Sequence, residues 1–173
     1  MVKWEPPISP YFKLNTDGFS LGNPGKVSAG GLIRDHLGQW IKDYTRRLGI
    51  ASSTEAELWG LRDGLELAIK CNINKLFIDM DASAALSLVQ SEVPLAHPLS
   101  VVICDCRWLM GRFLEVHLQH NFRESNKCAD ILARKGDGVD FTCTVFNNPP
   151  SWMLDQLQAK GVSYPRHVLN SIT

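Results

Sequence analysis

The stretch Leu14–Gly25, LNTDGFSLGNPG, places an aspartate at the end of an apolar, β-favouring run. In YFKLNTD, residues 11–17, alternate side chains fall on opposite faces of an extended chain, which predicts a strand with Asp17 at its carboxyl end. Three glycines and a proline follow within the next eight residues. A turn that only reverses the chain would explain the glycines but not the acid. We therefore interpret Asp17 as a functional residue.

The next segments predict a meander followed by a crossover. Strands from about Ser28 to Arg34 and from about Gln39 to Arg47 are joined by the turn DHLG, and they extend the first strand into an antiparallel meander. Residues 51–70 repeat leucine and alanine with helical period behind a Ser/Thr cap. KLFIDMD, residues 75–81, is typical of a buried strand that a helical crossover makes parallel to its neighbour.

The second half of the chain predicts helices around one more strand, RFLEVHLQH at residues 112–120. The resulting order, βββαβααβα with a terminal helix, is typical of an α/β fold in which helices cover both faces of a mixed sheet. The predicted helices run from about Ala82 to Ser91, Leu99 to Gly111, Asn126 to Lys135, and Ser151 to Gly161.

Length and composition indicate one domain with flanking segments. A chain of 173 residues with 45% hydrophobic residues can bury one core of common size. We expect a linker-like, proline-rich segment at residues 1–11, the folded domain at residues 12–138, and a C-terminal extension with a short helix at residues 139–173. We also expect a monomer.

Charge and cysteine content narrow the partners and the compartment. Eighteen basic and eighteen acidic residues give no net charge, so any polyanion must be gripped locally rather than recruited by a global field. The apolar runs are too short for a membrane span, so no membrane partner is expected. Five cysteines without a secretory signal favour a reducing compartment, the nucleus or the cytoplasm. We interpret Cys104 and Cys106 as small buried residues on a helix rather than metal ligands.

Four carboxylates are candidates for one site. Asp17 and Asp81 end strands that are expected to be parallel neighbours about 4.8 Å apart, so these two acids meet at one edge of the sheet. Glu57 lies one turn into the first long helix, and Asp130 lies in the first turn of the late helix, where its charge suits the helix dipole. Each acid alone could be a solvated surface residue. Together they would need a compensating cation, because desolvating neighbouring like charges is costly.

The chemistry of these ligands favours Mg²⁺, with Mn²⁺ as the other option. The candidate set is made of hard oxygen ligands without a histidine or thiol cage, which argues against zinc. Two such ions about 3.5–4 Å apart can activate a water and steady the leaving oxygen of a phosphodiester. The four acids therefore indicate phosphodiester hydrolysis with two ions.

Four motifs carry a resemblance to a known family. TDGFSLGNPG, STEAELWGL, IDMDAS and RESNKCADILAR, in this order and spacing, resemble type 1 ribonuclease H, and most of all its plant retrotransposon-like, reverse-transcriptase-associated domains. The opening WEPP, FKLNTDG and the closing NPPSWMLDQL resemble the same plant domains, so the similarity spans nearly the whole chain. It implies a ribonuclease H-like fold with a five-stranded mixed sheet of order 3-2-1-4-5.

The resemblance also implies roles for individual acids. It assigns Asp17, Glu57, Asp81 and Asp130 as the metal-binding, catalytic carboxylates. Glu57 is preferred to a neighbouring glutamate because the family has an acid-leucine pair at this point. Asp79 stands where plant relatives often carry glutamate, which makes it a candidate outer-shell group.

Further roles follow from the same motifs. His120 lies ten residues before Asp130, the spacing of the family's mobile-loop histidine, which assists proton transfer or product release; the alternative is an exposed histidine at a strand end. Asn23 matches a residue that contacts the nucleic-acid strand in the minor groove. Ser53 and Thr54 occupy positions that present amides or hydroxyls to the substrate.

Two more positions complete the expected substrate contacts. Gly18 and the later glycines of the loop would let the backbone approach the sugar-phosphate chain closely. Recognition of the 2′-hydroxyl by such groups would separate RNA from DNA. Ser83 stands where many members have glutamine, so this contact should be weaker or different here.

The chain departs from many bacterial members in lacking a basic handle. SEVPLAHPLS, residues 91–100, bridges the two middle helices without lysine or arginine. Arg34 on the second strand, with Lys42, Arg46 and Arg47 on the third, is interpreted as part of an exposed edge with solvated charges. Affinity would then come from a fused or associated nucleic-acid-binding module.

The sequence thus predicts a metal-dependent endonuclease that cleaves the RNA strand of RNA/DNA hybrids. The first alternative is a catalytically weak or inactive, domesticated module of this fold that binds nucleic acid or a protein partner. A second alternative, a polynucleotidyl transferase such as an integrase, shares the fold but not these motifs in this order.

Overall fold

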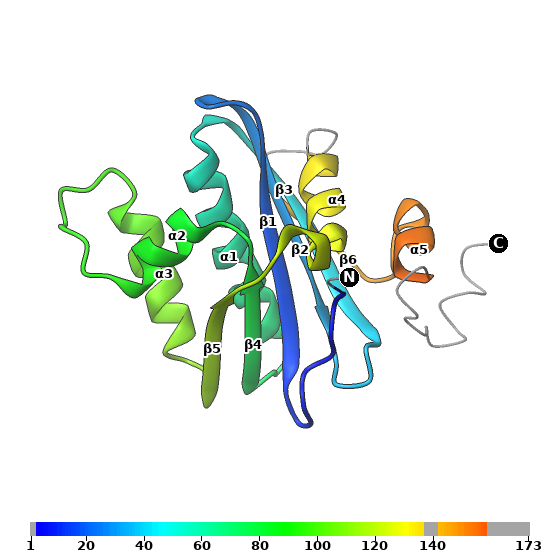
Figure 1. Cartoon of the computed structure of the whole chain (residues 1–173). Helices are drawn as coiled ribbons and strands as arrows, with labels where there is room; N and C mark the ends of the chain where they lie inside the picture. The colour runs from blue at the N-terminus through cyan, green and yellow to red at the C-terminus, as the bar shows by residue number, and fades with distance from the viewer. Residues whose placement is uncertain (1–2, 137–141, 159–173) are drawn as a thin grey trace.

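A six-stranded mixed sheet lies between two layers of helices in the computed structural model, which describes residues 3–136 and 142–158 (Figure 1). The sheet has the spatial order β5-β4-β1-β2-β3-β6. Its strands are β1 (Phe12–Gly22), β2 (Gly25–Arg34), β3 (Trp40–Ala51), β4 (Lys75–Met80), β5 (Glu115–His120) and β6 (Cys143–Phe146).

The first five strands confirm the implied order 3-2-1-4-5. Strands β1, β2 and β3 pair antiparallel, as a meander requires, and Gly38 takes a positive φ of 78° in the hairpin turn between β2 and β3. Strand β4 pairs parallel with β1, and β5 pairs parallel with β4, because helical crossovers separate them in the chain. The carboxyl ends of β1, β4 and β5 therefore point the same way.

The sixth strand corrects the expected five-stranded sheet. Strand β6 comes from the expected C-terminal extension and pairs antiparallel with β3, from Asp43 opposite Phe146 to Arg46 opposite Cys143. It is only four residues long, so it shows too little alternation to predict a strand. It forms because β3 presents an otherwise open edge, which β6 covers.

Of the α-helices in the described residues, three cover one face of the sheet and two cover the other (Figure 1). The first helix begins as predicted, since the Ser52 side chain caps it by accepting a hydrogen bond from the amide of Glu55 at 3.1 Å. The predicted end of the terminal helix at Gly161 lies outside the described residues. The helices are α1 (Ser53–Lys70), α2 (Ser83–Gln90) and α3 (Ser100–Met110) on one face, and α4 (Lys127–Lys135) and α5 (Ser151–Gln158) on the other.

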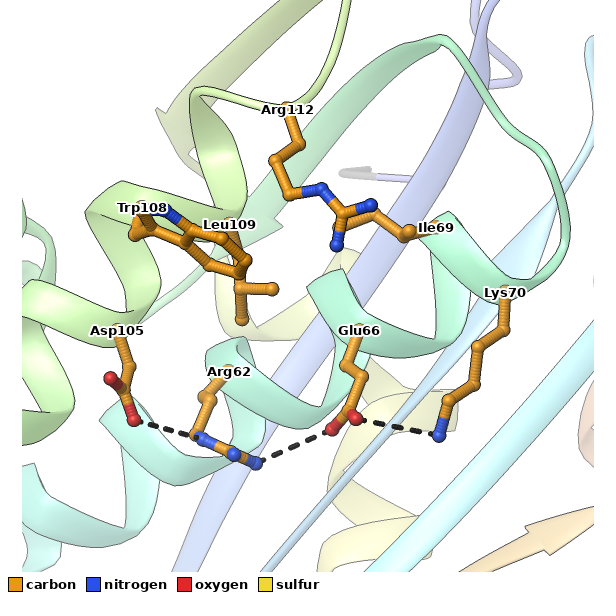
Figure 2. A pocket seen from close by; sticks show the side chains of 8 residues that line it. All are labelled: Arg62, Glu66, Ile69, Lys70, Asp105, Trp108, Leu109 and Arg112. Carbon is orange, nitrogen blue, oxygen red and sulfur yellow. Dashed lines mark hydrogen bonds and ion pairs between the residues drawn. The ribbon is translucent and has the colours of Figure 1, made fainter.

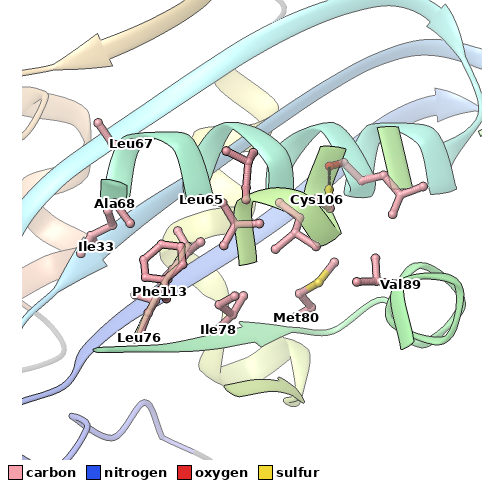
Figure 3. Packing of buried hydrophobic residues seen from close by; sticks show 14 of the residues in the cluster. Ile33, Leu65, Leu67, Ala68, Leu76, Ile78, Met80, Val89, Cys106 and Phe113 are labelled. Atoms are coloured by element: carbon pink, nitrogen blue, oxygen red, sulfur yellow. Dashed lines mark hydrogen bonds between the residues drawn. The ribbon is translucent and has the colours of Figure 1, made fainter. Parts of the chain in front are cut away.

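Each face of the sheet has its own hydrophobic core. The larger core packs α1 and α3 against β4, and Leu65, Ile78, Met80 and Phe113 lie within it (Figure 3). The smaller core lies under α4 and α5 and contains Leu32, Trp40, Cys128, Ala129, Leu132, Met153 and Leu157. These two cores hold the sheet and helices rigidly enough to place side chains at the sheet edge.

The two cysteines of α3 differ from expectation. Cys106 is buried in the larger core, as expected, whereas Cys104 is exposed. The reason is helical geometry, since residues two apart point about 200° around the helix axis from each other. No disulfide links the five cysteines, all of which are free.

The N-terminal segment (residues 3–11), expected to be linker-like, packs on the domain. Pro7 and Tyr11 are buried, and the Trp4 ring lies over the Arg34 guanidinium with its centroid 3.7 Å away. Arg34 is 1% exposed, which corrects the expectation of a solvated edge charge. Among the described residues, no helix is long and apolar enough to cross a membrane.

Candidate active site

The sheet register brings Asp17 and Asp81 together. The parallel pairing of β1 with β4 ends with Asn15 opposite Asp79, and each of the two acids lies two positions further along its chain. Glu57 reaches the same point from the second turn of α1. One carboxylate oxygen from each of these three acids lies within 4.8 Å of the others. The structure thus assembles three of the four predicted acids.

An open pocket of about 520 Å³ surrounds this acidic cluster. Asp130 lines the same pocket from the first turn of α4, so all four predicted acids face one space. The other lining residues come from β1, the start of α1, the start of α2, the turn before α4 and α4 itself: Gly18, Phe19, Ser20, Ser53, Thr54, Ala82, Ser83, Ala84, Ala85, Arg123 and Arg134.

Burial and mutual repulsion raise the pKa values of two acids in the cluster. Asp17 is 5% exposed, and its burial together with the neighbouring Asp81 carboxylate raises its pKa to about 8. Burial, and then the charge of Asp17, also raise the pKa of Glu57 well above its usual range. The buried Oε2 of Glu57 has no hydrogen-bond partner among the described residues. Within the same residues, the cationic side chains near the site pair with Asp81 and Asp130, so the charges of Asp17 and Glu57 stay costly to bury.

Two arginines lie at the rim of the cluster. Arg134 donates to both carboxylate oxygens of Asp130 at 3.1 Å, and the Arg123 Nε lies 3.5 Å from Asp81. The Arg123 side chain is 86% exposed, so this ion pair is weak and screened by solvent. The sequence reasoning missed both arginines, although both lie within RESNKCADILAR and Arg134 has the i,i+4 spacing to Asp130 that forms helical ion pairs.

The close packing of α1 on β1 requires a glycine at position 18. A Cβ at this position would lie 2.7 Å from the backbone nitrogen of Glu57. Helix α1 therefore approaches β1 too closely for any side chain at this point. This close approach places Glu57 next to Asp17, whereas the expected role of Gly18 toward a sugar-phosphate chain stays a prediction.

The expected substrate contacts separate into two groups. Ser53, Thr54 and Ser83 line the acidic pocket, as a substrate contact requires. Asn23 is not among the described residues that line it; its Oδ1 accepts a hydrogen bond from the amide of Ser53 at 3.1 Å. Asn23 thus holds the β1–β2 turn against the first residue of α1.

His120 lies outside the acidic pocket as the described residues define it. It is the last residue of β5, pairs with Met80, and has an exposed side chain. Its ring makes an edge contact with Phe122, with centroids 6.1 Å apart. In this structure it is thus an exposed strand-end histidine, and its role toward the site stays a prediction.

Asp79 is fully buried and has its own partners. Its carboxylate forms an ion pair with Lys13 at 3.2 Å and accepts hydrogen bonds from Gln119 at 2.6 Å and Asn121 at 2.8 Å. These groups saturate the carboxylate, so Asp79 is not itself a ligand in the cluster. Its link to Asn121 nevertheless reaches the segment that leads to α4.

A second pocket of about 260 Å³ lies between α1 and α3, with Trp108, Leu109 and Arg112 on one side (Figure 2). Its acids already have cationic partners. Arg62 lies 3.3 Å from Asp105 and 3.4 Å from Glu66, and Lys70 lies 3.4 Å from Glu66 (Figure 2). This pocket is therefore less suited to a metal ion than the acidic cluster.

The comparisons with known proteins agree with this geometry. The sequence model of the family described as Reverse transcriptase-like matches residues 15–136, which include all four acids. The chain belongs to this family. An Arabidopsis thaliana relative, which its name places among ribonuclease H proteins, is 32% identical over 97% of this chain and 27% of its own length. The present chain thus spans about a quarter of the length of that relative.

Solved structures show the same fold as this family member. The N-terminal RNase H domain of Rv2228c from Mycobacterium tuberculosis is 25% identical, has a TM-score of 0.68, and aligns over 73% of this chain and 92% of its own. LC11-RNase H1, solved in complex with an RNA/DNA hybrid, is 22% identical with a TM-score of 0.64 over 72% of this chain and 94% of its own. The fold is therefore ribonuclease H-like.

Proposed function

We propose that this chain is a metal-dependent endonuclease that hydrolyses the RNA strand of RNA/DNA hybrids. The observation that carries the proposal is the acidic cluster, in which oxygens of Asp17, Glu57 and Asp81 lie within 4.8 Å of one another beside Asp130. Membership of the Reverse transcriptase-like family supports it, as do relatives named for ribonuclease H and a neighbour solved with a hybrid.

The residues of the cluster fit a divalent cation, and we propose Mg²⁺ with Mn²⁺ as a substitute. All the ligands are carboxylate oxygens, which hard cations prefer, and the buried Oε2 of Glu57 has no hydrogen-bond partner among the described residues. Asp17, Glu57, Asp81 and Asp130 would hold two ions. Bound there, the ions would supply an activated water and stabilise the negative charge at the scissile phosphate.

The side chains around the acids would bind and orient the substrate. Ser53, Thr54 and Ser83 offer hydroxyl groups at the pocket wall, where they can donate to a ribose 2′-hydroxyl or a phosphate. Arg123 and Arg134 offer guanidinium groups that match phosphate geometry. The acids hold the reacting centre, and these groups select the strand that enters it.

We further propose that the bare domain acts as a monomer and relies on a fused or associated module for affinity. The net charge is zero, and the family relative is about four times longer than the matched region. The free cysteines support a reducing compartment, the nucleus or the cytoplasm.

A cleavage assay tests the proposed function directly. A 5′-labelled RNA strand paired with DNA should be cut with millimolar Mg²⁺ and stay intact with chelator, while RNA/RNA and DNA/DNA duplexes stay intact in both. Binding of the hybrid without any cutting in Mg²⁺ or Mn²⁺ would instead identify an inactive binding module. If the chain neither bound nor cut the hybrid, the proposal would be contradicted altogether.

His120→Ala should slow cleavage about 10–100-fold, because a proton-transfer group contributes less than the metal ions. His117→Ala is the matched control, since His117 lies on the same strand with its ring stacked on Phe77 and has no proposed role in the reaction. Single-turnover rates of both variants would be compared. Equal cleavage rates in the two variants would mean that His120 is an exposed residue without a role in the reaction.

Affinity for hybrid should show a shallow salt dependence. Log affinity is expected to fall by about 0.7–0.9 per log unit of salt for each phosphate contacted, and the pocket offers few cations. Arg134→Ala should lower the slope by about one such step, whereas Arg112→Ala, in the pocket between α1 and α3, should leave it unchanged. Binding isotherms at several salt concentrations measure both slopes. A steep slope of log affinity against log salt in the bare domain would contradict binding through only a few phosphate contacts.

A further inference from the structure

A chain of hydrogen bonds, partly buried at Trp4 and buried at Asn15 and Asn126, leads from the N-terminal segment to helix α4. Trp4 Nε1 donates to the Oδ1 of Asn15 at 2.8 Å, and the Nδ2 of Asn15 donates to the Oδ1 of Asn126 at 3.0 Å. Asn126 in turn donates to the carbonyl of Thr16 at 2.9 Å, and its own carbonyl accepts from the amide of Asp130 at 3.1 Å. Asn126 therefore joins the residue before Asp17 to the backbone of Asp130.

A second chain of polar contacts starts at Glu5, the residue after Trp4. Lys13 Nζ donates to the carbonyl of Glu5 at 2.9 Å and pairs with Asp79 at 3.2 Å. Asp79 accepts from the side chain of Asn121 at 2.8 Å. The two chains thus end at Asn121 and Asn126, which bound the segment between β5 and α4 (residues 121–126).

This β5–α4 connection carries groups of the candidate active site. Asn121 Oδ1 accepts from the amide of Phe122 at 2.8 Å, and a short 3₁₀ turn, Arg123–Ser125, follows. Arg123 in this turn contacts Asp81, and α4 begins at Lys127. A shift of the connection would therefore move Arg123 and Asp130 relative to the acids on β1 and β4.

Burial makes the Trp4 end of the network rigid. Asn15 is 0% exposed and Asn126 is 1% exposed, so neither amide can exchange its partners for water. The Trp4 ring covers Arg34, whose Nη2 donates to the same Oδ1 of Asn15 at 3.1 Å. Removing the indole would expose this cluster to solvent and weaken each electrostatic contact in it.

We propose that the N-terminal segment is a positioning element of the active site: Trp4, through Asn15 and Asn126, holds Asp130 at its distance from Asp17. Lys13 and Asp79 support the other end of the β5–α4 connection. Residues 3–11 are thereby part of the functional unit and not a spacer. The catalytic consequence rests on the proposed function, whereas the physical coupling does not.

Hydrogen–deuterium exchange of the metal-free protein tests the coupling without any activity. Trp4→Ala should speed exchange in residues 121–130 by about tenfold, and Trp4→Phe, which keeps the ring over Arg34 but loses the donor, by about threefold, in line with the loss of one partly buried hydrogen bond. Ile8→Ala is the matched control, because Ile8 is 71% exposed in the same segment.

The location of the change decides the outcome. Faster exchange that is confined to residues 3–11, or that rises equally in Ser100–Met110 of α3, would overturn the proposal, because the first means no coupling and the second means global destabilisation. Circular dichroism melts show whether Trp4→Ala still folds. Should it unfold, Trp4→Phe against Ile8→Ala carries the test.

Cleavage kinetics test the catalytic consequence. In Trp4→Phe the Mg²⁺ concentration for half-maximal cleavage should rise about three- to tenfold while the KM for hybrid stays unchanged, since a displaced ligand weakens the metal site first. A lower rate with an unchanged Mg²⁺ midpoint would overturn a positioning role. If the unmodified chain does not cleave, the proposed function fails, and the exchange experiment still decides the coupling.

Discussion

Asp81→Asn should reduce hybrid cleavage by several orders of magnitude while the fold stays intact. An amide keeps the shape of the carboxylate but is a far poorer ligand for a hard dication. A carboxylate oxygen of Asp81 also lies within 4.8 Å of carboxylate oxygens of Asp17 and Glu57, so the loss of its charge acts on the whole cluster. Single-turnover cleavage in saturating Mg²⁺ measures the effect, and far-UV circular dichroism verifies the fold.

Asp105→Asn is the matched control for this experiment. Asp105 is an aspartate on α3 whose partner is Arg62 in the pocket between α1 and α3. Its removal should change the cleavage rate by less than about twofold, since surface ion pairs contribute little. Cleavage by Asp81→Asn at the rate of the Asp105→Asn control would mean that the acidic cluster is not the catalytic site.

Asp17→Asn should abolish cleavage and also stabilise the protein in chelator at pH 7, by roughly 0.5–2 kcal/mol. Asp17 is buried beside Asp81, so its charge is costly when no cation is present, and an amide removes that charge. The amide can still accept the hydrogen bond that the amide of Gly18 donates to Oδ1 at 2.9 Å. Melts of both proteins in chelator measure the difference.

The stability advantage of Asp17→Asn over the unmodified chain in chelator should increase with pH. The folded-state pKa of Asp17 is raised to about 8, so its protonated form stabilises the fold fully below about pH 4 and this contribution is lost as the pH rises through 8. The advantage of Asp17→Asn should therefore grow from pH 5 to pH 8. Burial also raises the pKa of Asp43 to about 8, but Asp43 is present in both proteins and cancels in the comparison.

Magnesium should reduce the stability difference between Asp17→Asn and the unmodified chain, because it stabilises the unmodified site by mass action and binds the variant less well. Melting temperatures of both proteins, measured in chelator and in millimolar Mg²⁺, therefore test this expectation. A lower melting temperature for Asp17→Asn than for the unmodified chain in chelator would mean that the acids are not a repelling cluster. Asp17 would then be a structural residue at the glycine turn.

Much of the candidate site could be predicted because it depends on local patterns. Asp17 and Asp81 end apolar runs, and the crossover between those runs makes the two strands parallel, so their acids had to meet at one edge. The Ser/Thr cap predicted where the first long helix begins and placed Glu57 one turn into it, and in the structure Ser52 is that cap. Short-range periodicity and connection rules suffice for these features.

The tertiary structure alone decided which polar groups are partners across long sequence separations. Asn15 meets Asn126, and Lys13 meets Asp79, because the sheet register and the docking of α4 bring them together. The short β6 became a strand only because β3 offered an open edge.

Burial separated residues that look alike in the sequence. Arg34 and Arg123 are both arginines in polar surroundings, yet one lies beneath Trp4 with 1% of its surface exposed and the other has a side chain that is 86% exposed. His120 has the family's spacing to Asp130 but stands outside the pocket lined by the described residues. The sequence by itself determined the first five strands and the crossover, because these follow from periodicity within a few residues, and it indicated the four acids from their places at strand ends and in helices together with the family motifs. Solvent access and side-chain partners depend on segments 100 residues apart packing together, as Asn15 and Asn126 do at a separation of 111, so only the folded chain could decide them.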